Sequence, residues 1–62
     1  MEVTMNQDLY RVTVTEYDDG AQRPCPELTK IFTEPREADA YAKVQSVTFS
    51  RSLFYRAEVQ QI

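Results

Sequence analysis

The side chains that most often carry out catalysis or bind metals are scarce in this chain of 62 residues, which has no histidine, one cysteine and one glycine. A serine or cysteine nucleophile needs a base beside it, and that base is most often histidine. A zinc site needs several cysteine or histidine ligands, and a phosphate-binding loop needs several glycines. We therefore expect a protein that is not an enzyme and that binds no metal and no cofactor.

Two pairs of carboxylates have the spacing for acid–base chemistry, but each pair also has a structural explanation. Asp18 and Asp19 precede Gly20, and an Asp-Gly pair is typical of a tight hairpin turn. Glu34 and Glu37 lie at the predicted start of a helix, where the helix dipole favours negative charge. We interpret both pairs as structural rather than catalytic.

Cys25 is the one residue with the chemistry for a redox or modification site. It lies between Pro24 and Pro26, and a reactive thiol needs surroundings that lower its pKa. Arg23 is the only nearby side chain that could do so. We therefore interpret Cys25 as an inert and partly buried thiol.

The net charge of −3 is unevenly distributed along the chain. Residues 1–40 hold nine acids and four bases, for a net charge of −5, and residues 41–62 hold three bases and one acid, for a net charge of +2. Nucleic-acid-binding domains usually carry a basic surface. The acidic balance makes such a function less expected than protein binding.

The sequence predicts a cytoplasmic protein. Its first residues lack the basic region and the apolar stretch of a secretory signal peptide. No apolar run approaches the roughly 20 residues that a membrane-spanning helix needs. A free thiol is typical of a reducing compartment.

The first half of the chain predicts a β-hairpin. Residues 10–17 alternate in polarity and are rich in β-branched and aromatic side chains, which indicates a strand. After the turn, the partner strand is expected to begin at Glu27 or Leu28 and to end at Phe32. Residues 21–26 include two prolines, which lack a backbone donor, so this segment is predicted as a loop or as the irregular start of an edge strand.

A helix and a last strand are predicted in the second half. Pro35 suits the first helical position, where a backbone N–H would have no partner, and apolar residues recur at helical spacing to about Gln45 or Val47. Alternation returns in residues 53–60 and indicates a strand. Residues 46–52 are consistent with a fraying helix end, a short strand or an apolar plug.

These elements predict an α+β fold of β-β-α-β order in a single domain covering residues 1–62, with residues 1–7 disordered. Connections seldom cross, and crossovers between parallel strands are right-handed. The simplest arrangement is a three-stranded antiparallel or mixed sheet of order 2-1-3, with one helix on one face. Its best buried side chains are expected to be Val12, Val14, Phe32, Tyr41 and Val59.

One helix covers only one face of a sheet, so the other face is predicted to be open. The pattern places Arg11, Ile31, Phe54 and Arg56 on that face, and arginine and aromatic residues often dominate protein interfaces. Half-exposed antiparallel sheets are common, so a plain solvated face stays an alternative. We expect a small protein-binding factor; the alternatives are a nucleic-acid-binding module and a self-associating subunit such as a homodimer. No membrane partner is expected.

The hairpin, the junction over residues 32–38 and the closing strand resemble small β-β-α-β proteins that bacteriophages use against host machinery, such as the podophage inhibitors of bacterial RNA polymerase. The resemblance covers roughly residues 9–61 and lies in element order and spacing. It implies an inhibitor or accessory factor that acts on host RNA polymerase or another host protein. Those inhibitors contact polymerase through arginines on the last strand; Arg56 matches one of them, and Glu58 stands where a second would be expected. The junction is also similar to the arm-type DNA-binding domains of tyrosine integrases, which are basic and place the helix last.

Overall fold

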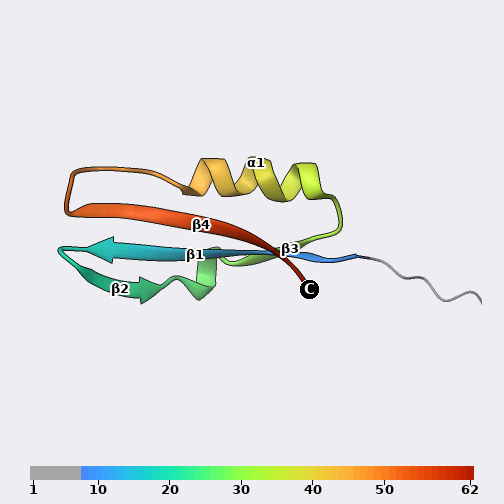
Figure 1. Ribbon diagram of the computed structural model, residues 1–62, viewed down its shortest axis with the longest axis horizontal. Helices are drawn as coiled ribbons and strands as arrows, with labels where there is room; N and C mark the ends of the chain where they lie inside the picture. The colour runs from blue at the N-terminus through green and yellow to red at the C-terminus, as the bar shows by residue number, and fades with distance from the viewer. Residues whose placement is uncertain (1–7) are drawn as a thin grey trace, which may run out of the picture.

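The computed structural model describes residues 8–62, so the prediction that residues 1–7 are disordered lies outside the described residues. The chain forms an α+β fold with the expected order of strands and helix (Figure 1). Its elements are β1 (Tyr10–Asp18), β2 (Ala21–Pro24), the short 3-10 helix η1 (Pro26–Leu28), β3 (Lys30–Phe32), α1 (Pro35–Gln45) and β4 (Leu53–Gln61).

β1 is the central strand of the sheet. β4 pairs antiparallel with the whole of β1 on one side, and β2 and β3 pair antiparallel with its two ends on the other side. β2 and β3 are therefore two parts of one edge strand. The predicted order is confirmed: the first strand lies in the middle, its hairpin partner (β2 and β3) on one side and the last strand (β4) on the other.

The turn between β1 and β2 has the backbone that the Asp-Gly pair predicts. Asp19 and Gly20 both have positive φ, at 53° and 88°. Positive φ at both central residues defines the type I′ turn, whose twist matches that of the strands it joins. The sequence prediction of a tight hairpin is confirmed.

The edge strand differs from the prediction in where it begins. Of the two alternatives for residues 21–26, the edge strand is the one that forms, as β2 from Ala21, but Glu27 and Leu28 lie in η1, which interrupts the edge strand, and pairing resumes only at Lys30. The interruption follows from Pro24 and Pro26, because neither residue can donate to a strand ladder. Between them, the N–H of Cys25 still donates to the carbonyl of Val14 at 2.9 Å.

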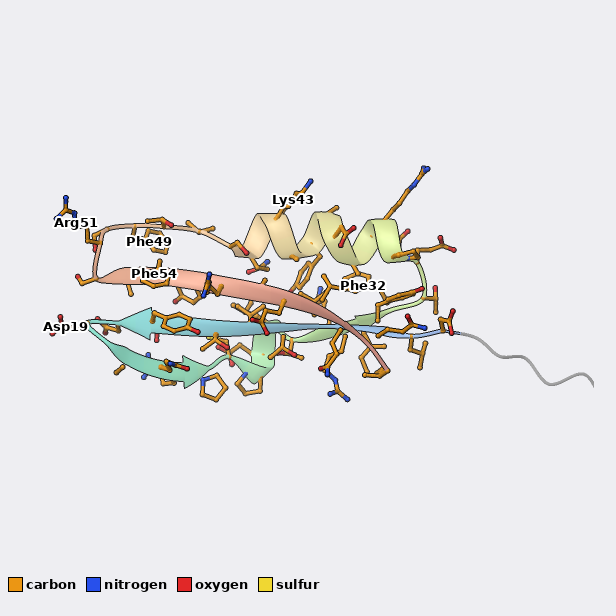
Figure 2. The ribbon with its side chains drawn as sticks, viewed as in Figure 1. Asp19, Phe32, Lys43, Phe49, Arg51 and Phe54 are labelled. Carbon is orange, nitrogen blue, oxygen red and sulfur yellow. The ribbon has the colours of Figure 1, made fainter. Side chains whose placement is uncertain are left out.

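The helix begins at Pro35 and ends at Gln45, within the predicted bounds. Ala38 and Ala42 are buried against the sheet, and these small side chains allow the helix to lie close to it. Phe32 lies between the sheet and the start of the helix (Figure 2), and its ring centroid is 5.3 Å from that of Tyr41. No helix in residues 8–62 is both long enough and apolar enough to span a membrane.

Of the three alternatives for residues 46–52, the short strand is closest to the structure. Thr48 forms an isolated antiparallel bridge with Phe54. The N–H of Tyr55 donates to the carbonyl of Val47 at 2.7 Å, and that of Phe49 donates to Leu53 at 3.0 Å. This segment therefore covers the outer edge of the first residues of β4.

The core is smaller than the sequence predicts. Val12 and Val14 are fully buried as expected, but Phe32 and Tyr41 are only partly buried, and Val59 is 37% exposed. Val59 lies on an edge strand, which has a neighbouring strand on one side only. The other buried residues are Cys25, Ala38 and Ala42.

Candidate functional site

The face of the sheet opposite α1, here called the open face, is the candidate site. The alternation of β1 places Val12 and Val14 toward the helix and its odd-numbered residues on the opposite side. The strand register extends this division to the neighbouring strands. The open face therefore carries Arg11, Thr13, Thr15, Tyr17, Gln22, Pro24, Ile31, Phe54, Arg56, Glu58 and Gln60.

The structure places all four predicted site residues on the open face but does not bring them together. Arg11 pairs with Ile31 on one side, and Ile31 is 54% exposed. Arg56 pairs with Thr15, which is four residues further along β1. At about 3.3 Å per residue, the two arginines are separated by roughly 13 Å along the strands. The expected single cluster is therefore two smaller groups at opposite ends of the face.

Tyr17 is the site residue that sequence reasoning missed. Its ring stacks on that of Phe54, with centroids 4.9 Å apart and planes 7° from parallel. The two residues are directly opposite each other on β1 and β4, and such cross-strand aromatic pairs stabilise a sheet. The odd parity of Tyr17 on β1 was the signal that could have placed it on this face.

Arg56 lies next to this aromatic pair. Arg56 and Phe54 are two residues apart on β4, so their side chains point to the same face. The Arg56 side chain is exposed, and the one salt bridge within residues 8–62 joins Arg23 and Glu16 instead. We call Tyr17, Phe54 and Arg56 the aromatic–arginine patch.

The open face differs in charge from the rest of the described chain. It carries Arg11 and Arg56, and Glu58 is its only acidic residue within residues 8–62. The chain as a whole has a net charge of −3. The open face therefore carries more basic than acidic side chains, although the chain as a whole is acidic.

A polar network on the opposite side of the sheet explains three of the remaining charged and aromatic residues. One carboxylate oxygen of Glu16 accepts hydrogen bonds from the Arg23 guanidinium, and the other accepts one from the Tyr55 hydroxyl at 3.0 Å. The Arg23 hydrogen bond, followed by that from Tyr55, lowers the pKa of Glu16. The pKa of Tyr55 is raised, chiefly because its hydroxyl donates a hydrogen bond to the Glu16 carboxylate. This network joins β1 to β2 and to β4.

Residues 8–62 show no pocket and no group of three or more acidic, cysteine or histidine side chains that could hold a metal ion. Cys25 is buried at the edge of the core, where its thiol is 3.8 Å from the Arg23 carbonyl.

Comparisons of the chain with protein-family models, with curated proteins and with solved structures found no match in any of the three.

Proposed function

We propose that this protein acts by binding another protein through its open face, with the aromatic–arginine patch at the centre of the contact. The observation that carries the proposal is the stacked pair of Tyr17 and Phe54 beside the exposed Arg56. Aromatic residues and arginine supply much of the binding energy at protein interfaces. Two stacked rings on a sheet also lose little conformational freedom on binding.

The chemistry of the patch defines the partner surface that would fit it. The exposed guanidinium of Arg56 pairs well with a carboxylate, because its geometry allows two parallel hydrogen bonds. The edges of the stacked Tyr17 and Phe54 rings offer apolar area beside it. A partner with an acidic side chain next to an apolar contact is therefore expected.

For the class of partner, we propose a cytoplasmic host protein, with bacterial RNA polymerase as the first candidate. The β-β-α-β order and the position of Arg56 on the last strand support this choice. Glu58, on the same face and strand, gives the contact a mixed charge. The protein would then act as an inhibitor or accessory factor of a phage or mobile element.

Protein binding explains the open face better than nucleic-acid binding does. Proteins that bind single strands stack bases on aromatic side chains, whereas Tyr17 and Phe54 each have one ring face occupied by the other. The acidic net charge also opposes binding to phosphates.

The test compares single variants in binding to immobilised bacterial RNA polymerase and in capture from bacterial lysate. Arg56→Ala and Phe54→Ala should weaken the complex by about 1–2 kcal/mol or more, because each removes a central contact. Arg36→Ala makes the same change at an exposed position of α1 and should bind as wild type. Arg11→Ala, at the other end of the open face, should have the smaller effect of the two open-face arginine variants.

Two results would contradict the proposal. One is full binding by the patch variants together with loss of binding by a helix variant such as Lys43→Ala, whose side chain points away from the sheet (Figure 2). The other is binding to nucleic acid alone, with an affinity that falls steeply with salt. Circular dichroism of each variant controls for unfolding.

A further inference from the structure

We infer that the outer edge of β4 is a self-association site, at which a second copy of this chain adds its own β4 as an antiparallel strand. This inference does not depend on the proposed function, because it concerns the backbone edge of β4 rather than the side chains of the open face. Addition of a strand to an exposed sheet edge is a recurrent mode of protein recognition.

The hydrogen bonds of β4 show which backbone groups point outward. The N–H of Tyr55 donates to the Val47 carbonyl at 2.7 Å, and that of Ala57 donates to the Ser46 hydroxyl at 3.2 Å. Both bonds lie on the side away from β1. Because alternate residues of a strand direct their backbone groups to the same edge, the groups of Val59 and Gln61 also point outward.

These outward groups have no partner within residues 8–62. β1 is the only strand that pairs with β4 over Leu53–Gln61. Residues 46–50 hydrogen-bond with the first half of β4, and their last contact along the strand is the Ser46 bond to Ala57. The N–H and C=O of Val59 and of Gln61 lie beyond that point.

The opposite edge of the sheet, formed by β2 and β3, is blocked against pairing with another strand. The end of β4 is not blocked in this way, which supports its use as a pairing site. Proteins block their edge strands with proline, irregular backbone and inward-pointing charge, because an open edge is a template for pairing. The β2–β3 edge has all three devices: Pro24 and Pro26, the η1 interruption, and Lys30 over the Tyr41 ring at 5.1 Å. The last residues of β4, Glu58 to Gln61, have neither proline nor interruption.

One two-fold register satisfies the bare groups without displacing any existing bond. Antiparallel pairing centred on Gln60 places Val59 opposite Gln61 of the second copy, and every outward N–H and C=O of these two residues gains a partner. Gln60 then lies opposite Gln60 of the second copy, and the two amide side chains can hydrogen-bond to each other. A register centred on Glu58 would place two carboxylates opposite each other, and one centred on Val59 would compete with Ser46 for the Ala57 N–H.

The size of the core favours a second copy as the occupant. Val12 and Val14 are the only large side chains that are fully buried within residues 8–62, and domains of this length often depend on a second subunit for stability. Pairing would also cover part of Val59 and Ile62, which are 37% and 47% exposed. A two-fold axis perpendicular to the sheet would join the two open faces into one continuous surface.

The test measures the mass of the protein against concentration for the wild type and two variants at one position. The wild type should change from monomer to dimer as concentration rises. Gln61→Pro removes an outward donor without touching the β1–β4 ladder, and should raise the dimer Kd about tenfold or more, since two symmetry-related hydrogen bonds are lost. Gln61→Ala keeps the N–H and should dimerise as wild type.

A second measurement on the wild type does not depend on the folding of any variant. In hydrogen exchange, the Val59 and Gln61 amides should become protected as the protein concentration rises. A wild type that stays monomeric at all concentrations would overturn the inference, as would a folded Gln61→Pro variant that dimerises as tightly as Gln61→Ala. Protection of both amides that is independent of concentration would also overturn it, because it would show that the chain covers its own edge.

Discussion

Glu16 and Tyr17 are neighbours in the sequence and serve opposite faces of the sheet. Glu16 points to the helix side, where it bonds to Arg23 and Tyr55. Tyr17 points to the open face and stacks on Phe54. This division follows from the two-residue period of a strand. A change at Glu16 should therefore affect stability alone, and a change at Tyr17 should affect the proposed binding surface as well as the sheet that its stacking stabilises.

The lowered pKa of Glu16 predicts how stability depends on pH. A carboxylate whose pKa is lower in the folded state contributes stability that is complete above its unfolded-state pKa of about 4.3 and is lost as the pH falls through the folded-state pKa. Glu16→Gln should remove this contribution, so the free energy of unfolding should fall less steeply in acid than in the wild type.

Urea unfolding at a series of pH values below neutral checks this prediction. Glu58→Gln removes a carboxylate from an exposed position on β4 and controls for the change in net charge. An acid-dependent loss of stability that is the same in Glu16→Gln and in the wild type would show that the Arg23 and Tyr55 contacts do not stabilise the fold.

At the scale of the elements, the hairpin, the helix and the last strand could be predicted because each has a strong local signal. Asp19 and Gly20 specify the turn, and Pro35 specifies the helix start. Local patterns do not specify how prolines divide an edge strand, so the η1 interruption was not predicted, and Cys25, which was expected to be partly buried, is buried. Val59 was predicted to be buried but is exposed. Its burial depends on whether another strand lies beside β4, and the local pattern does not show this either.

The turn between β1 and β2 gives a test of the hairpin. Gly20 has a φ of 88°, and a Cβ added there would meet no atom within 4 Å. Gly20→Ala should therefore lower the free energy of unfolding by about 1–2 kcal/mol through backbone strain alone. Asp19→Asn, a residue type that tolerates positive φ, should change stability by less than about 0.5 kcal/mol.

Urea midpoints for the two variants, compared at constant m-value, measure the difference. If Gly20→Ala unfolds at the same urea concentration as the wild type, the positive φ of this turn is not required for the fold.

At the scale of the whole molecule, the main feature is the uncovered side of the sheet. α1 packs on one side of the sheet, over β1, β3 and β4 and away from the β1–β2 turn, and within residues 8–62 no second long helix covers the other side (Figure 1). That side could be predicted from alternation and topology. Its division into an Arg11 group and an aromatic–arginine patch could not, because it depends on the register between β1 and β4.

The most direct measurement places a photo-crosslinking amino acid on each side of the molecule. Gln22 is exposed on the open face and lies opposite Tyr17, and Ala40 is exposed on α1. In bacterial cells, the probe at Gln22 should form one crosslinked protein product that is lost when Arg56→Ala is added. The probe at Ala40 should form none. Crosslinking from Ala40 alone, or a Gln22 product that Arg56→Ala leaves unchanged, would contradict binding through the aromatic–arginine patch.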